Sequence, residues 1–194
     1  MYTKKNNFEL FESNVQSVRE DWIDYNGHMN VAYYTLAFDK ALDDFLEKNL
    51  EIGPTYVKRE KKGPYSLQAN YHYLDELRIT DEFFTKIYLI NSDNKKIHLV
   101  LEMINFNTNK QVAVCETLLI NVDLNIRKSV EYDIDVINRI EDYKKNCKIF
   151  NLPLQIGKEI KIRKKKNYSF EQILFNQDLF SPSNFTSYFL ITFW

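Results

Sequence analysis

The chain of 194 residues contains only four glycines and four prolines. Phosphate-binding loops of the Walker and dinucleotide-binding types need several glycines at fixed spacing, and no such arrangement occurs in this sequence. A phosphate-bearing ligand would therefore have to be held by side chains or by the N-terminus of a helix.

Cysteine is equally scarce, with Cys115 and Cys147 as the only two. Cys115 lies inside an apolar, strand-like run, so neither a disulfide framework nor a zinc site is indicated, and we expect a reducing compartment. No cluster of potential ligands has the spacing of a metal site. We therefore predict no metal and no redox cofactor.

Long hydrophobic runs and a charge imbalance are also missing. No apolar run approaches the roughly 18 residues that span a bilayer, and the polar residues 1–7 lack the hydrophobic region of a signal peptide. The formal net charge of -1 gives no overall reason to expect nucleic-acid binding. These absences predict a cytoplasmic protein with neither a nucleic-acid nor a membrane partner.

The composition that remains is that of a globular protein, with 44% hydrophobic and 27% charged residues. The length suits one ordinary domain with a substantial core. Beyond Pro153 the character of the chain changes, since a basic run at 158–166 precedes an aromatic stretch with few charges. We predict one domain at 1–146 and a C-terminal extension of unknown role at 147–194.

Residues 31–50 have the apolar period of a long helix. Asn30 is a favourable N-cap for this helix, and Gly53-Pro54 mark its exit after Ile52. The apolar stripe is wide enough to be buried against a sheet, and it consists of Tyr34, Phe38, Ala41, Leu42, Phe45 and Leu46.

Strand-like patterns lie on both sides of this helix in the sequence. One entering strand is predicted within 8–20, and four more follow at 65–74, 82–91, 96–107 and 111–124, joined by short polar turns. Residues 133–146 indicate an amphipathic surface helix. Together these patterns predict an α+β fold in which an antiparallel sheet of about five strands wraps one long central helix.

Residues 21–34, Asp-Trp-Ile-Asp-Tyr-Asn-Gly-His-Met-Asn-Val-Ala-Tyr-Tyr, carry the strongest functional signal. Asp24 stands three residues before Gly27 and four before His28, and the helix begins just after Asn30. A carboxylate that can act as a base, an imidazole and unpaired helix N-terminal amides therefore meet within one short segment. The backbone N–H groups of residues 29–31 are candidates for binding a developing oxyanion.

The order Asp24-Tyr-Asn-Gly27-His28-Met-Asn30, followed by one long helix and then strands, resembles the hotdog-fold thioesterases. Within them it is similar to the 4-hydroxybenzoyl-CoA thioesterase-like group, whose signature is Asp-x-x-Gly-His-x-Asn. In more detail the chain resembles the thioesterase domain fused to L-carnitine dehydrogenases and the stand-alone betainyl-CoA thioesterases. The segments that extend this likeness are Trp22–Tyr34, Ala37–Asp39, Tyr65–Ala69, Tyr73-Leu74, Ile97–Leu99, Glu102-Met103 and Val122-Asp123.

This resemblance implies an acyl-CoA thioesterase that hydrolyses a short acyl-CoA such as betainyl-CoA, with coenzyme A present only as part of the substrate. Asp24 matches the family's catalytic aspartate, which acts as a general base or as a nucleophile. The family forms homodimers or homotetramers, commonly with the active site at a subunit interface. One departure limits the transfer of mechanism. Some relatives carry a catalytic histidine seven residues after the aspartate, where this chain has Val31.

Each residue of the motif also has a structural interpretation. Asp24 can be a loop carboxylate near a helix start. His28 can brace the turn at Gly27 rather than orient water or contact the thioester. Asn30 can cap the helix, contact the carbonyl or do both, and Gly27 can permit a close backbone approach or a positive φ. We predict Asp24, His28 and Asn30 as the catalytic residues.

The predicted substrate-binding residues surround this motif. Trp22, Tyr25, Tyr33 and Tyr34 could form a cage for a trimethylammonium group. Core and subunit packing is the alternative, in a chain with 13 Tyr and 14 Phe. Arg59, in the basic run 58–62, is a candidate contact for the CoA phosphates, as are the runs 95–96 and 163–166, although such runs are often solvated surface. The full set is Trp22, Tyr25, Gly27, Met29, Val31, Tyr33, Tyr34 and Arg59.

Two other functions are compatible with the same fold. A hydratase or dehydratase acting on acyl-CoA could use His28 with an acid, although the order Asp-x-x-Gly-His-x-Asn argues against it. A non-catalytic acyl-CoA binding module is the second alternative, because the aromatic segment 185–194 has no assigned role. Release of free thiol from acyl-CoA esters separates both from a thioesterase.

Overall fold

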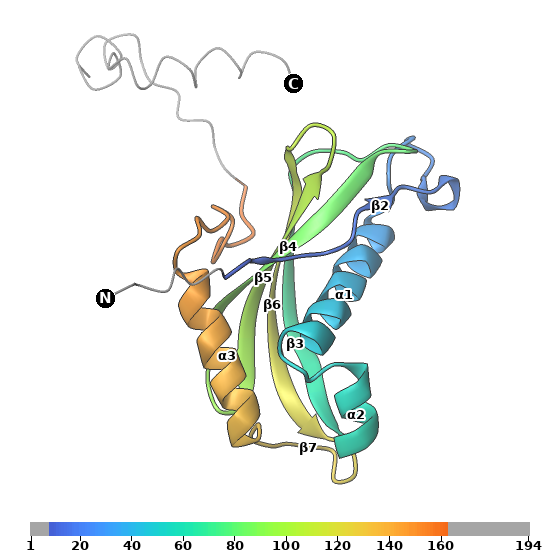
Figure 1. The fold of residues 1–194 in the computed structure, drawn as a ribbon. Coiled ribbons are helices and arrows are strands. Elements are labelled where there is room, and N and C mark those ends of the chain that lie inside the picture. Colours follow the sequence, from blue (N-terminus) through green and yellow to red (C-terminus); the bar gives the residue numbers. More distant parts are fainter. Residues whose placement is uncertain (1–7, 163–194) are drawn as a thin grey trace, which may run out of the picture. The chain divides into compact units, whose positions relative to one another are not determined.

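In the computed structural model, which describes residues 8–162, helices pack against an antiparallel sheet (Figure 1). This arrangement confirms the predicted α+β class. The elements in chain order are β1 (Phe11–Glu12), β2 (Gln16–Ser17), a 3₁₀ turn (Glu20–Trp22), α1 (Val31–Lys48), α2 (Pro54–Glu60), β3 (Lys62–Tyr73), β4 (Glu82–Ser92), β5 (Lys96–Asn105), β6 (Gln111–Asp123), β7 (Lys128–Ser129) and α3 (Ile134–Cys147).

The sheet has the strand order β1-β4-β5-β6-β3, with β2 paired to β4 and β7 paired to β6. The four long strands predicted from the sequence are confirmed as β3 to β6. The single entering strand predicted within 8–20 is instead divided into β1 and β2. The division occurs at Ser13, whose side-chain oxygen accepts the Thr85 N–H (2.9 Å) while its own N–H donates to the Thr85 carbonyl (2.9 Å).

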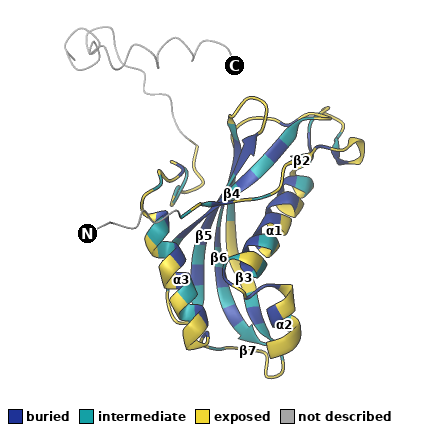
Figure 2. Ribbon diagram, viewed as in Figure 1, coloured by how far each residue is buried: buried dark blue, intermediate teal, exposed yellow. Residues whose placement is uncertain are grey.

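Helix α1 begins where the sequence predicts. Asn30 has extended backbone angles, and its side chain accepts the N–H of Ala32 (2.9 Å), so it is the N-cap. The face of α1 that carries the apolar stripe is buried, and the opposite face is exposed (Figure 2). The chain then enters α2, a helix that the sequence did not predict, since Gly53-Pro54 were interpreted only as the end of the preceding helix. Pro54 starts this helix, because proline suits the first helical turn, where its missing N–H costs nothing.

Helix α3 is part of the core as well as of the surface. Val136, Ile140, Tyr143 and Cys147 are buried. The Tyr143 hydroxyl accepts the Phe11 N–H (3.0 Å) and donates to the Ile87 carbonyl (3.1 Å). This hydroxyl therefore links α3 to β1 and β4. The prediction of a surface helix was right about its polar face and underestimated its packing.

The chain after α3 lies on the sheet face opposite α1. Phe150 and Ile156 pack against a small apolar cluster of Tyr88, Val100 and Val114, and the Gly157 N–H donates to Glu116 Oε2 (2.8 Å). One compact unit runs as far as Lys158. The predicted division of the chain at residue 146 stays a prediction, and the runs at 163–166 and 185–194 lie outside the described residues.

Among residues 8–162, no helix is both long and apolar enough to cross a membrane. The predicted cytoplasmic location stays a prediction.

Candidate functional site

The motif forms a tight turn in front of α1. The Asp24 N–H donates to the His28 carbonyl (3.0 Å), and the Gly27 N–H donates to the Asp24 carbonyl (3.0 Å). Gly27 has a φ of 85°, in the left-handed region where a side chain would be strained. The positive φ was one of the two roles predicted for this glycine, and it brings Asp24 and His28 to the same end of α1.

The loop between β3 and β4 holds this turn in place. The Met29 N–H donates to the Leu77 carbonyl (2.7 Å), and the Leu77 N–H donates to the hydroxyl of Tyr34 (3.0 Å). Burial raises the pKa of Tyr34 to about 12, so this hydroxyl stays neutral at physiological pH. Leu77, about 50 residues further along the chain, is therefore a fixed neighbour of the motif.

The three candidate oxyanion amides are not equivalent. The Met29 N–H donates to Leu77, and the Asn30 N–H donates to the Trp22 carbonyl (2.9 Å), so both are used within the fold. For the Val31 N–H, no acceptor lies within the described residues. Val31 is the first residue of α1 and is 59% exposed. Of the three backbone N–H groups predicted as candidates for binding an oxyanion, only that of Val31 therefore remains a candidate.

The Asp24 carboxylate is largely buried and is held through one of its two oxygens. Its side chain is 15% exposed, and Oδ1 accepts the N–H of Asn26 (2.8 Å). For Oδ2 no hydrogen-bond donor lies within the described residues. The hydrogen bond to Oδ1 therefore orients the carboxylate, and Oδ2 remains free to accept a hydrogen bond. A carboxylate held in this way can take a proton from water or attack a carbonyl carbon.

His28 lies between two carboxylates. Its Nε2 is 4.0 Å from Asp24 Oδ1, and its Nδ1 is 3.9 Å from Glu76 Oε2. Arg78 pairs with the other oxygen of Glu76, with its Nε 2.9 Å from Oε1. Glu76 and Arg78 lie in the β3–β4 loop and were not predicted as site residues. No local sequence pattern could have found them, because only the tertiary fold brings that loop to the motif.

The predicted aromatic cage is not assembled within one chain. Trp22 is buried and stacks on Tyr33, with 5.3 Å between ring centroids, whereas Tyr25 is 97% exposed. Tyr34 is buried and packs edge-to-face on Tyr73 (5.3 Å). Two groups result, one formed by Trp22 and Tyr33 and another that joins the first turn of α1 to strand β3. Tyr73 is half-exposed, and the sequence interpretation did not single it out as a site residue.

Arg59 lies far from the motif within one chain. It is in the last turn of α2, beyond the C-terminal end of α1, where it pairs with Glu60 (2.6 Å) (Figure 1). An 18-residue helix such as α1 is about 27 Å long. Arg59 and Asp24 therefore do not meet within a single chain, and the predicted phosphate contact stays a prediction.

Neither cysteine has the properties of an activated nucleophile. Burial raises the pKa of the Cys115 thiol to about 12, and it raises the pKa of Cys147 as well, so neither is a thiolate at neutral pH. Within residues 8–162 no three His, Cys, Asp or Glu side chains are grouped to hold a metal ion.

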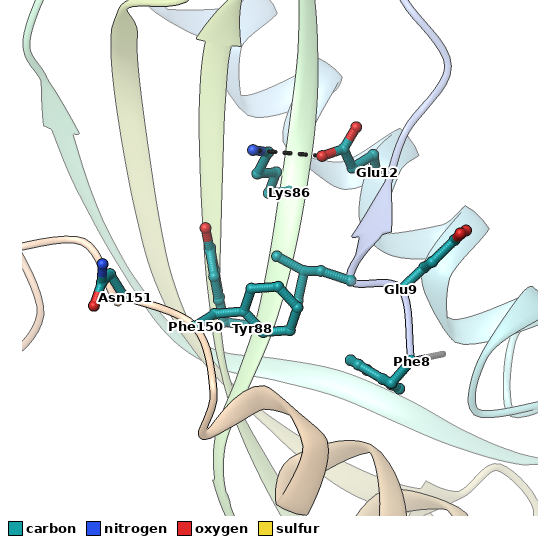
Figure 3. A pocket seen from close by; sticks show the side chains of 8 residues that line it. Phe8, Glu9, Glu12, Lys86, Tyr88, Phe150 and Asn151 are labelled. Carbon is teal, nitrogen blue, oxygen red and sulfur yellow. Dashed lines mark ion pairs between the residues drawn. The ribbon is translucent and has the colours of Figure 1, made fainter. Parts of the chain in front are cut away.

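A separate cavity of about 580 Å³ lies between the N-terminal segment, β4 and the chain after α3 (Figure 3). Lys86 and Glu12 form an ion pair at its wall (3.4 Å), and Tyr88 and Phe150 lie beside each other. None of the predicted site residues lines this cavity, whose walls are Phe8, Glu9, Leu10, Glu12, Lys86, Tyr88, Phe150 and Asn151.

Comparison with known proteins gives a consistent result. A family model described as the thioesterase-like superfamily matches residues 18–140. A betainyl-CoA thioesterase of Pseudomonas aeruginosa is 25% identical over 145 residues, which cover 74% of this chain and 89% of that protein. A bifunctional L-carnitine dehydrogenase/betainyl-CoA thioesterase of Rhizobium meliloti is 27% identical over 124 residues, 64% of this chain, and the chain spans only 25% of its length.

Among solved structures, a hypothetical protein of Staphylococcus aureus in complex with CoA superimposes with a TM-score of 0.74. It is 24% identical, and the match covers 80% of this chain and 96% of that one. At this level of identity the match concerns the fold.

Proposed function

The chain belongs to the thioesterase-like superfamily and is a thioester hydrolase with the hotdog fold, and from this premise we propose that it hydrolyses a short acyl-CoA. The observation that carries the proposal is the arrangement of Asp24 beside the N-terminus of α1, whose first amide has no acceptor among the described residues. The match to a family of thioesterases and the CoA complex of a protein with the same fold support it.

In the proposed reaction, Asp24 takes a proton from water as the water oxygen attacks the thioester carbon. The carbonyl electrons move to oxygen, and the Val31 N–H with the positive end of α1 stabilises the resulting oxyanion. Collapse of this intermediate expels the CoA thiolate and leaves the free acid. In the alternative route, Asp24 attacks the carbon directly, the carbon–sulfur bond breaks to release the CoA thiolate, and water then hydrolyses the mixed anhydride to free acid and Asp24. Both routes need an ionised, oriented carboxylate.

We propose betainyl-CoA as the substrate. Betainyl-CoA thioesterase is the name of the Pseudomonas aeruginosa relative, whose length the chain nearly spans. The half-exposed ring of Tyr73 packs on Tyr34 in the first turn of α1 and suits a trimethylammonium group. A cation–π contact contributes about 0.5–2 kcal/mol, so a contact with Tyr73 is consistent with a measurable preference for a cationic acyl group.

A panel of acyl-CoA esters tests this function. We expect release of free thiol from betainyl-CoA with a kcat/KM about 10-fold above that of an uncharged acyl-CoA of equal length, because tenfold corresponds to about 1.4 kcal/mol and lies within the range of one cation–π contact. Equal values of kcat/KM for the two esters would contradict betainyl-CoA as the preferred substrate, but not the thioesterase activity. Hydration or dehydration of an acyl-CoA without thiol release would contradict the thioesterase itself, and binding without turnover would indicate a binding module.

The site is proposed to be completed by a second copy of the chain. Strand β3 is the last strand of the sheet order, and among the described residues it pairs only with β6. Five consecutive residues of β3, 65–69, are exposed, including Tyr65 and Leu67. An exposed edge of this length is a template for pairing with another strand. Because Tyr73 of the same strand contacts Tyr34 in α1, such pairing would bring the partner towards the motif.

A charge on this edge should weaken the association. Leu67→Lys is expected to shift the protein from dimer towards monomer in light scattering and to lower kcat/KM in parallel, because lysine on an edge strand opposes edge-to-edge pairing. Ile149→Lys is the matched control, since Ile149 is an exposed isoleucine that follows α3, away from β3. A wild-type monomer with full activity would contradict the proposed interface.

A further inference from the structure

Both nitrogens of the His28 ring face carboxylates, and the two carboxylates come from distant parts of the chain. We propose that Glu76 is a positioning residue that holds the proton of His28 on Nδ1, so that Nε2 orients the water that attacks the thioester. This inference rests on the proposed thioesterase function. Neither the motif nor its spacing suggests Glu76, which lies in the β3–β4 loop.

The β3–β4 loop is fixed to the motif and to α1 through Leu77. Leu77, the residue after Glu76, accepts the N–H of Met29, the residue after His28 (2.7 Å). The same leucine donates its own N–H to Tyr34 in the first turn of α1 (3.0 Å). Glu76 and His28 are therefore neighbours because both backbone groups of Leu77 are hydrogen-bonded, one to the backbone of Met29 and the other to the hydroxyl of Tyr34.

Arg78 decides which oxygen of Glu76 faces the histidine. Its guanidinium binds Oε1, and Oε2 is left 3.9 Å from Nδ1 of His28. A movement of about 1 Å brings these atoms to hydrogen-bond distance. Both side chains are partly exposed, at 38% for His28 and 43% for Glu76, so they have room to make it. In the hydrogen bond formed by this movement the Glu76 carboxylate can only accept, so the ring donates from Nδ1.

The other nitrogen then has a lone pair directed towards Asp24. Its distance of 4.0 Å from Asp24 Oδ1 is too long for a hydrogen bond. Two acceptors that share the two hydrogens of one water lie about 4.4 Å apart, given hydrogen bonds of about 2.8 Å and the bond angle of water. The pair is thus spaced to hold one water, with one hydrogen on Asp24 and the other on His28. A lone pair of that water is left for the thioester carbon.

This role does not depend on the side chain of Val31, the first residue of α1. Val31 is an exposed apolar residue that cannot orient water. His28, fixed by Glu76, supplies an imidazole at the same end of α1. An exposed ion pair adds little to stability, so the expected effect of Glu76 is on turnover and not on folding.

The first test is kinetic. Glu76→Gln is expected to lower kcat for a hydrolysed acyl-CoA by about 10- to 100-fold with KM within twofold, because a misplaced water costs rate and not binding. Asp75→Asn is the matched control, since Asp75 is the adjacent carboxylate and pairs with Lys110 (3.8 Å). In a His28→Gln background, Glu76→Gln should have no further effect, because Glu76 acts through His28.

The second test is spectroscopic and needs no substrate. Nitrogen-15 shifts of the His28 ring, assigned with His28→Gln, should report the Nδ1–H form in the neutral wild type and the Nε2–H form in Glu76→Gln. Unchanged shifts, an unchanged kcat, or additive losses in the double variant would each overturn the proposal. If no acyl-CoA is hydrolysed, the proposed function fails, whereas the ring tautomer still decides whether Glu76 positions His28.

Discussion

Asp24→Asn should lower kcat for acyl-CoA hydrolysis by about 100- to 10,000-fold, the range that general-base residues contribute. Asparagine has nearly the same shape and keeps the oxygen that accepts the Asn26 N–H, but it can neither take a proton nor attack a carbon. The loss should therefore appear in kcat, with the fold and KM unchanged. Thiol release under saturating substrate measures it.

Asp21→Asn is the matched control for this variant. Asp21 lies three residues earlier, is exposed, and pairs with Arg19 rather than with the motif. Its replacement should change kcat by less than about twofold, since exposed ion pairs contribute little. Equal rates for wild type and Asp24→Asn would remove Asp24 from the reaction under either route, as general base or as nucleophile.

Phe45→Ala should reduce the free energy of unfolding by about 3–5 kcal/mol. Phe45 is fully buried in α1 and packs edge-to-face on Phe11 (5.6 Å) and on Tyr143 (4.9 Å). Its removal leaves a cavity at the point where α1, β1 and α3 meet, so the loss combines transfer and cavity terms. Urea denaturation at one fixed protein concentration measures it, because association also adds to apparent stability.

Two variants bracket this result. Phe45→Leu keeps most of the apolar volume and should cost less than the alanine variant. Phe106→Ala removes a half-exposed ring and should change stability by less than about 1 kcal/mol. If Phe45→Ala were as mild as Phe106→Ala, the packing of α3 on α1 would be contradicted.

Elements with a strong local signal were predicted well. Helix α1 was predicted at 31–50 and spans Val31–Lys48, because its apolar stripe and the Asn30 cap are both readable within the segment. The long strands β3 to β6 were found in the same way, from residue type and polar turns. Helix α2 was missed because its seven residues are too few to show a period. The division between β1 and β2 was missed because it depends on Thr85, far along the chain.

The candidate site shows the same distinction. The turn at Gly27 and the cap at Asn30 follow from residues within one short segment. The choice of Val31 among the three candidate amides does not, because the carbonyls of Leu77 and Trp22 accept the N–H groups of the other two, Met29 and Asn30. The four aromatic residues of the predicted cage look equivalent in the sequence, and burial alone separates Trp22 and Tyr34 from the exposed Tyr25.

The sequence by itself placed a carboxylate, a glycine turn and a helix start in one segment, because these are local features whose hydrogen bonds close within a few residues. The resemblance of this segment to the hotdog-fold thioesterases indicated the class of chemistry. The sequence also determined which face of α1 is buried, through the period of its apolar residues. The tertiary structure alone decided that Glu76 faces His28 and that the N–H groups of Met29 and Asn30 donate to carbonyls within the fold. The reason is physical: an apolar period shows which face of a segment is buried, but it does not show which distant segment packs against that face.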